Sequence, residues 1–238
     1  MRTIKNFKNL FRMLKNQNDE LIWANVWHDT RKGIPWLADM PGISPGRWAV
    51  GYNYLYVMTR ILNEWKPVSV LELGLGVSTT LISKYFESMD DHTDAVHIIA
   101  EHDHDWITFY GKSHPLSACS VIKKQKLVTK RDGNEKYYTY ENLAESIQGH
   151  KFQIISVDAP FGGGYKSRTD ILELLPDILE KEFVIIMDDV NRIGERNTCL
   201  QIKQVLNDHH IKWVDTVYEG ATHCCVIASY NNRFFCSL

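Results

Sequence analysis

Glycines and polar residues occur in the order E-x-G-x-G-x-S at the end of the apolar run VSVLELG, residues 68–74. They are Glu72, Gly74, Gly76 and Ser78, within the stretch LELGLGVSTT. Glycine lets a backbone turn sharply from a strand into a helix and lets a ligand approach closely, and the helix start then offers unpaired N–H donors. The third glycine of the dinucleotide fingerprint is absent, which weakens an interpretation as an NAD site. The pattern predicts a ligand-binding turn or a purely structural one.

The second candidate is Glu101, the last residue of the apolar run AVHIIAE. A carboxylate at this position of a nucleotide-binding sheet commonly accepts hydrogen bonds from both hydroxyls of a ribose. The spacing from Gly74 exceeds the roughly 20 residues usual for this partner, and the polar insert SMDDHTDA accounts for the excess. The His-Asp-His-Asp run at 102–105 contains metal-ligand types, but consecutive loop residues seldom converge on one ion. We therefore expect Glu101 to bind the ribose of an adenosine cofactor.

A third candidate is Asp158, which ends the apolar run FQIISVD and is followed at once by APFGGGYKSR. The run is typical of a central strand, and Pro160 stops the strand from continuing. The glycines at 162–164 predict either a mobile loop that closes over an acceptor or a permissive turn. Asp158 is accordingly a functional carboxylate at a strand end or one that caps the loop. The residues beyond the glycines either contact an anionic acceptor, such as a uronate or a nucleotide sugar, or form a solvated face: Tyr165, Lys166 and Arg168.

These candidates need a sheet that brings several strand ends to one edge. Short apolar runs that end in an acidic residue or glycine predict strands buried on both faces, with helices between them. Such alternation indicates a parallel sheet with right-handed crossovers, and ligands bind beyond the carboxyl ends of its strands. The expected strands are 68–74, 95–101, 152–158 and 183–189, and the expected helices are 78–88, 140–148, 168–180 and 196–208.

The C-terminal stretches IKWVDTVYE and THCCVIASY have no helix between them. The short connection EGAT predicts a hairpin, so that one strand runs antiparallel to the rest. The expected fold class is α/β, with a Rossmann-like, doubly wound and mostly parallel sheet, a C-terminal antiparallel hairpin strand and an N-terminal helical cap.

The first 18 residues predict a basic amphipathic helix. Its apolar stripe either lies on an anionic membrane or packs against the domain or a second subunit, and we expect packing, because such stripes usually serve a core. The members of the stripe are Ile4, Phe7, Leu10, Phe11 and Leu14, and the basic residues are Arg2, Lys5, Lys8, Arg12 and Lys15.

The tryptophan-rich segment that follows, to about residue 44, has no clear period and predicts an irregular cap. Ser44 as N-cap and Pro45 in the first turn predict the start of a long helix that ends near residue 67. We divide the chain into a helical cap, residues 1–65, and an α/β domain, residues 66–238.

The overall composition is that of a soluble globular protein. The 238 residues carry a net charge of -2, without the basic surplus of a nucleic-acid binder. No stretch has the length of a bilayer-spanning helix or the form of a secretory signal, and the five cysteines have no zinc-ligand spacing. We expect a cytoplasmic protein with reduced thiols.

Together these segments resemble class I S-adenosylmethionine-dependent methyltransferases over roughly residues 66–230: VLELGLGVSTTL, the strand that ends on Glu101, VDAP, IIMDD and the final hairpin. The family motif is E-x-G-x-G-x-G, and Ser78 replaces its last glycine. The resemblance implies that Glu72, Gly74, Gly76 and Ser78 line the methionine and ribose part of an S-adenosylmethionine site and that Glu101 binds the ribose.

Two narrower resemblances lead to different acceptor chemistry. Glucuronoxylan 4-O-methyltransferases are similar in the GLG-x-x-S turn, the acidic stretch before Trp106 and the VDAP-x-G loop, which implies a sugar hydroxyl as acceptor. Cation-dependent catechol and caffeoyl-CoA O-methyltransferases are similar in the strand-end carboxylates Asp158, Asp188 and Asp189, which implies bound Mg²⁺. Phe161 stands where that second family has lysine, and Asp189 where it has asparagine.

Without a metal, Asp158 is the expected general base for the acceptor hydroxyl, because it ends a strand beside the expected sulfonium. We interpret the chain as an S-adenosylmethionine-dependent O-methyltransferase acting on a sugar or another small hydroxyl compound, in surface polysaccharide biosynthesis. The N-terminal helix gives possible peripheral membrane contact, and an oligomer is compatible with the sequence. The alternatives are a non-catalytic module that binds S-adenosylmethionine or a nucleotide, and an NAD or nucleotide-sugar enzyme on a similar sheet.

Overall fold

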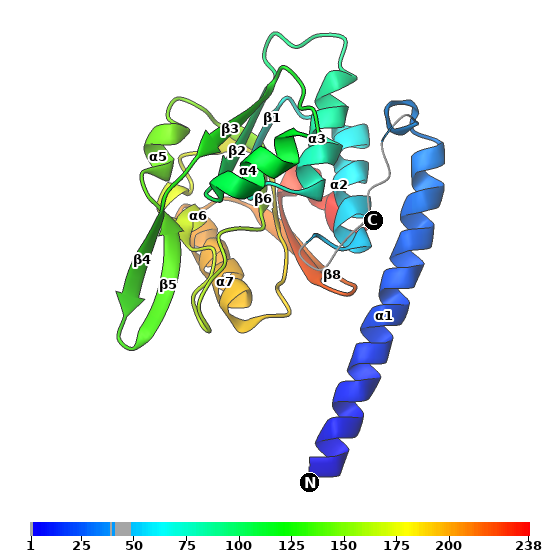
Figure 1. The fold of residues 1–238 in the computed structure, drawn as a ribbon, viewed down its shortest axis with the longest axis vertical. Coiled ribbons are helices and arrows are strands. Elements are labelled where there is room, and N and C mark those ends of the chain that lie inside the picture. The colour runs from blue at the N-terminus through cyan, green and yellow to red at the C-terminus, as the bar shows by residue number, and fades with distance from the viewer. Residues whose placement is uncertain (1, 39, 41–48) are drawn as a thin grey trace.

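The computed structural model describes residues 2–38, 40 and 49–238. Its centre is a seven-stranded sheet in the order β3-β2-β1-β6-β7-β9-β8 (Figure 1). Neighbouring strands are parallel except in the pairs β7–β9 and β8–β9, so the expected mostly parallel sheet with a C-terminal antiparallel strand is confirmed. The strands are β1 Ser69–Leu73, β2 Val96–Glu101, β3 Ser120–Lys124, β6 Phe152–Val157, β7 Leu179–Met187, β8 Trp213–Glu219 and β9 His223–Ser229.

Helices cover both faces of the sheet. Every residue of β1 is buried, because successive side chains alternate between two cores: Val70 packs in one and Leu71 in the other. The first core lies under α2 Tyr52–Trp65, α3 Val77–Glu87 and the 3₁₀ helix η2 Tyr230–Cys236. The second lies under α5 Leu143–Ser146, α6 Asp170–Leu174 and α7 Ile193–Asp208, and α4 His104–Gly111 follows the end of β2.

The order of the strands reverses beside β1. From β1 the chain crosses to β2 and β3 on one side, and it then returns to β6 on the other side. The loops after β1 and β6 therefore diverge above the sheet and leave a crevice at their carboxyl ends, where open α/β sheets bind ligands.

The N-terminal helix differs from the prediction in length and in the face that it buries. It is one helix, α1 Arg2–Lys32, so the prediction of an irregular segment after residue 18 is wrong as far as Lys32. Trp27 is fully buried and donates a hydrogen bond to Thr59 Oγ1 at 3.0 Å, whereas Phe7 and Phe11 are 61% and 64% exposed. Leu10 and Leu14 are exposed as well. The expected packing against the domain is therefore wrong for the four described side chains of the stripe, and packing against a second subunit stays a prediction. The described part of α1 extends well beyond the body (Figure 1).

No helix in the described ranges is long and apolar enough to cross a membrane. In the cap, a 3₁₀ turn, η1 Pro35–Leu37, follows α1. The helix α2 begins at Tyr52 with Gly51 as N-cap, and the predicted start at Ser44 and Pro45 lies outside the described residues.

Two other predicted helices are shorter than expected. The stretch 140–148 contains the end of a strand and then the four-residue α5, and 168–180 contains α6 and the start of β7. The sequence prediction also missed a two-stranded antiparallel hairpin between β3 and β6: β4 Leu127–Asp132 and β5 Glu135–Tyr140.

Candidate functional site

One pocket joins the glycine turn to two of the predicted carboxylates. It lies at the carboxyl ends of β1, β2 and β6, and its volume is about 120 Å³. Gly74, Gly76, Ser78, Glu101 and Asp158 all line it. Five of the residues predicted from separate motifs therefore meet at the switch point of the sheet. Its other lining residues are Ala49, Val50, Leu75, Val77 and Ala159.

The sharp turn after β1 depends on Gly74. Its φ is +114°, a region that residues with a side chain rarely adopt, and a Cβ there would lie 3.1 Å from the Cβ of Ala159. Gly76 has extended backbone, and its N–H donates to Thr79 Oγ1 at 3.0 Å as α3 begins. The turn thus brings the start of α3 and the loop after β6 to opposite sides of the pocket.

Backbone donors fix the carboxylate of Glu101 at the end of β2. Its Oε1 accepts from the N–H groups of His102 and Asp103, at 2.6 and 2.8 Å, and its Oε2 accepts from the N–H of Leu75 at 3.1 Å. The side chain is buried but lines the pocket. Each carboxylate oxygen has two lone pairs, so Oε2 retains acceptor capacity toward a ligand hydroxyl. Asp103 is itself the N-cap of α4, as expected for a carboxylate near a helix start.

The fifth cofactor candidate, Glu72, lies beneath the pocket and does not line it. Its side chain is fully buried, and Oε2 lies 2.9 Å from Nε2 of His97, a residue of the neighbouring strand β2. The structure thus separates Glu72 from the four other residues of the predicted cofactor site.

Three carboxylates lie together at the ends of β6 and β7, and two of them contact the guanidinium of Arg168. One oxygen from each of Asp158, Asp188 and Asp189 lies within 4.8 Å of the others. Arg168 Nη2 lies 3.0 Å from Asp158 Oδ1 and 2.8 Å from Asp189 Oδ2. The side chain of Arg168, which the sequence placed among the acceptor contacts, is only 4% exposed and is held inside this cluster.

The pKa of Asp158 rises to about 8. Burial is the main cause; the nearby Arg168 cation opposes it, and the Asp188 carboxylate adds to it. Burial, followed by the charge of Asp189, likewise raises the pKa of Asp188 to about 6. The side chain of Asp158 is still 26% exposed, so a ligand or water can reach a carboxyl group that titrates near neutral pH.

The carboxylate cluster does not fit Mg²⁺ with Arg168 in place. A divalent ion would approach these oxygens at about 2.0–2.6 Å, in the space between Asp158 and Asp189 that Nη2 fills. The predicted magnesium site is therefore not supported by the arrangement of its own residues.

The glycine loop after Asp158 rests on the β4–β5 hairpin. Glu135 on β5 accepts hydrogen bonds from the N–H groups of Tyr165 and Lys166, and the ring centroids of Phe161 and Tyr138 are 4.6 Å apart. A Cβ on Gly163 would lie 2.3 Å from Lys136 O. The side chain of Tyr165 is exposed. This contact was not predicted from the sequence, although the Asp-Gly dipeptide at 132–133 is a strong hairpin signal.

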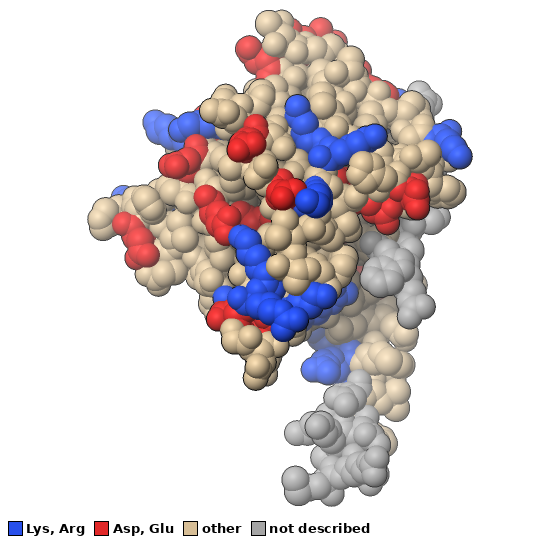
Figure 2. Space-filling view, turned by 60° about the vertical axis from the view of Figure 1, so that its left-hand side comes forward, with Lys and Arg blue, Asp and Glu red and all other residues tan. Residues whose placement is uncertain are grey.

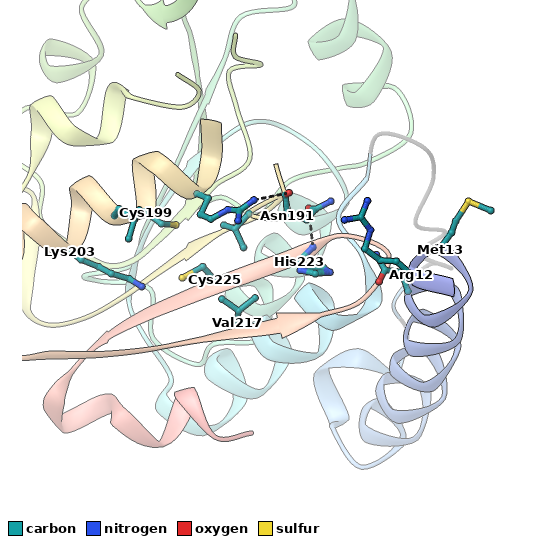
Figure 3. A pocket seen from close by; sticks show the side chains of 12 residues that line it. Arg12, Met13, Asn191, Cys199, Lys203, Val217, His223 and Cys225 are labelled. Carbon is teal, nitrogen blue, oxygen red and sulfur yellow. Dashed lines mark hydrogen bonds between the residues drawn. The ribbon is translucent and has the colours of Figure 1, made fainter. Parts of the chain in front are cut away.

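A second cavity, of about 690 Å³, lies between α1, α7 and the β8–β9 hairpin (Figure 3). Its described lining includes Arg12, Arg196, Lys203 and His223 and no carboxylate. Lys203 is paired with Asp215, and burial lowers the pKa of His223, so Arg12 and Arg196 supply its available positive charge. Figure 2 shows Lys and Arg side chains gathered low on one face of the molecule.

No protein-family model matches the chain, and no curated protein matches it. Its fold is similar to an SAH-bound methyltransferase of Podospora anserina, PaMTH1, with a TM-score of 0.50, 14% identity and coverage of 95% of this chain and 96% of that one. A methyltransferase of Pyrococcus furiosus aligns with a TM-score of 0.47 and 14% identity over 87% and 97% of the two chains. Spermidine synthase from Thermotoga maritima aligns with a TM-score of 0.45 and 16% identity over 75% and 58%. Together with the strand order, the similarity to PaMTH1 shows that the chain has the Rossmann-like fold of class I methyltransferases.

Proposed function

We propose that the protein is a methyltransferase that transfers the methyl group of S-adenosylmethionine to a hydroxyl oxygen. The observation that carries this proposal is the single pocket in which the glycine turn at 74–78, Glu101 and Asp158 meet. In a doubly wound sheet this is the place where a nucleoside cofactor binds.

The residues of the pocket suit an adenosine-containing sulfonium. Glu101 is fixed by three backbone donors and keeps an acceptor position for a ribose hydroxyl. Gly74 and Gly76 keep the backbone close to the ligand, and Ser78 lies in the first turn of α3. A cavity of about 120 Å³ is smaller than the roughly 300 Å³ at the low end of ligand pockets, so we expect the walls to separate on binding.

S-adenosylmethionine supplies an activated methyl group. The acceptor oxygen forms a bond to the methyl carbon as the carbon–sulfur bond breaks, and the electron pair of that bond stays on sulfur. Asp158 takes the hydroxyl proton, because it lines the pocket and its pKa lies near neutrality. Its remaining exposure lets the proton pass to solvent before the next turnover.

The acceptor that we favour is an anionic sugar or another small hydroxyl compound, used in surface polysaccharide synthesis. The 690 Å³ cavity supports this choice: Arg12 and Arg196 make no ion pair with any described residue, and Val190 and Asn191 at its edge directly follow the Asp188–Asp189 pair. Tyr165, exposed on the loop beyond Asp158, is a further candidate for contact with the acceptor.

The location that we favour is the cytoplasmic surface of a membrane, reached through α1. Its exposed stripe includes Phe7, Leu10, Phe11 and Leu14, and the first 18 residues contain five basic and no acidic residues. Apolar side chains beside basic ones are what an anionic lipid surface binds.

Calorimetry with S-adenosylmethionine, S-adenosylhomocysteine and NAD tests the cofactor. Transfer from methyl-labelled S-adenosylmethionine to uronic acids, sugar nucleotides and polysaccharide fragments then tests the reaction, and stability of the product to mild base distinguishes an ether from a methyl ester. We expect binding of the first two ligands and a base-stable product. Binding of NAD alone would contradict the proposal, and cofactor binding without transfer to any acceptor would favour the non-catalytic alternative.

A further inference from the structure

The guanidinium of Arg168 lies between the carboxylates of Asp158 and Asp189. Nη2 contacts Asp158 and Asp189 at 3.0 and 2.8 Å, and Nη1 donates to the backbone oxygens of Asp188 and Val157 at 2.7 and 3.3 Å. One guanidinium thus joins the ends of β6 and β7, the two strands that present the carboxylates.

The chain on both sides of Arg168 is also fixed. Ser167 donates to Glu195 Oε1 at 2.9 Å, and Thr198 Oγ1 donates to Ser167 O at 2.6 Å, so α7 holds the residue before Arg168. The side chain of Arg168 is only 4% exposed. It is therefore a built part of the site and not a surface side chain that has folded over an acidic cluster.

Other donors already occupy oxygens of the cluster, beside Arg168. Besides Arg168, the guanidinium of Arg192 contacts Asp189 Oδ2 at 2.9 Å, and Thr222 donates to Asp188 Oδ1 at 2.9 Å. Glu195 lies 3.9 Å from Arg192. A divalent ion would have to displace Arg168 and leave its charge buried without a partner, which is strongly unfavourable.

We propose that the Arg168 guanidinium takes the place of a divalent cation and holds Asp158 in position to remove the acceptor proton. Arg168 is a positioning residue in this proposal, which rests on the proposed function for the role of Asp158. The exclusion of the metal depends only on the cluster itself.

Mn²⁺ binding, measured by electron paramagnetic resonance, tests the exclusion without methyl donor or acceptor. The variants are Arg168→Gln, which removes the cation between Asp158 and Asp189, and Arg192→Gln, which removes the outer guanidinium as a matched control. We expect no stoichiometric Mn²⁺ binding by the parent or by Arg192→Gln, and one Mn²⁺ bound at least tenfold more tightly by Arg168→Gln. Stoichiometric binding by the parent that Asp189→Asn abolishes would overturn the proposal, as would a folded Arg168→Gln that binds no better than the parent.

The pH profile tests the positioning role. Because Arg168 lowers the pKa of Asp158 against the effect of burial, Arg168→Gln should move the acid limb of kcat/KM upward by about one pH unit or more. Arg168→Lys keeps a cation but cannot bridge two carboxylates. This variant should shift the acid limb in the same direction and still exclude Mn²⁺. It replaces Arg168→Gln in the experiment if circular dichroism shows that Arg168→Gln does not fold. An unshifted limb in a folded variant would overturn the positioning role. If no methyl transfer is found at all, the metal-binding result still stands by itself.

Discussion

Glu72 Oε2 lies 2.9 Å from His97 Nε2, with both side chains fully buried between β1 and β2. The other ring nitrogen of His97, Nδ1, lies 2.8 Å from Ser120 Oγ. Glu72→Ala would therefore leave the buried His97 ring with a partner at Nδ1 and none at Nε2. We expect the free energy of unfolding, measured in urea, to fall by about 3 kcal/mol, while a comparable change at the exposed Glu180 should have little effect. A variant with normal stability and weakened S-adenosylmethionine binding would instead return Glu72 to the cofactor site.

The Glu101→Gln variant should bind S-adenosylmethionine about 10- to 100-fold more weakly, because hydrogen bonds to a charged acceptor contribute about 1.5–3 kcal/mol. The NH₂ group of the glutamine would also face a backbone N–H that donates to a carboxylate oxygen in the parent. Calorimetry measures the change, with Glu180→Gln as the surface control. An unchanged affinity would contradict the assignment of Glu101 to the ribose.

The rate of methyl transfer should rise with pH up to about 8. Asp158 accepts a proton only in its ionised form, and its pKa is raised from 3.8 to about 8, so the active fraction increases as pH passes through neutrality. A kcat/KM profile measured from about pH 6 to about pH 9, a range that includes both neutrality and the raised pKa, tests this increase. Asp158→Asn should lower the rate about 100-fold or more and remove the limb. A flat profile in the parent would exclude Asp158 as the base.

The glycine loop offers a matched pair of substitutions. A Cβ on Gly163 would lie 2.3 Å from Lys136 O, whereas a Cβ on Gly164 would meet only Glu135 Oε1 at 3.9 Å. We expect Gly163→Ala to separate the loop from the β4–β5 hairpin and Gly164→Ala to preserve the contact. Hydrogen exchange of the amides at 161–166 should be faster in the first variant only. Equal exchange in both would show that the hairpin does not restrain the loop.

Membrane binding through α1 can be tested with two equally exposed phenylalanines. Phe7 on α1 and Phe109 on α4 are both 61% exposed. Flotation with vesicles of phosphatidylglycerol and phosphatidylcholine should show binding that Phe7→Ser weakens about tenfold, since a buried phenylalanine contributes about 1.5–3 kcal/mol. Phe109→Ser should have no effect. Binding lost equally in both variants would contradict a specific role of α1, and a dimer that Phe7→Ser dissociates would assign the stripe to a second copy.

The strand ends could be predicted because buried parallel strands have a clear sequence pattern, a short run of apolar residues. The runs that became β1, β2, β6 and β7 are apolar on both faces, and the residue after each run is polar or glycine. The β4–β5 hairpin was missed because its strands are polar and partly exposed, so they do not form apolar runs. The length of α1 was underestimated because, beyond residue 18, apolar residues occur on two opposite faces.

The position of Arg168 could not be predicted from its neighbours in sequence. It follows a glycine loop with exposed residues, where an arginine is normally solvated. Its burial depends on Asp189, which lies 21 residues later, just after β7, and on the hydrogen bonds that Ser167 makes with Glu195 and Thr198 of α7. Contacts of this kind arise only when the crossover brings two strand ends together.

Arg168 is part of the polypeptide itself, and its buried guanidinium stays charged throughout the pH range of a cell. A bound ion must be acquired from the surroundings, and it can be lost to a chelator or exchanged for a competing metal. An active site built around Arg168 needs no such supply. The proposed methyl transfer should therefore continue at its full rate in cells starved of divalent metals, where metal-dependent methyltransferases would slow down.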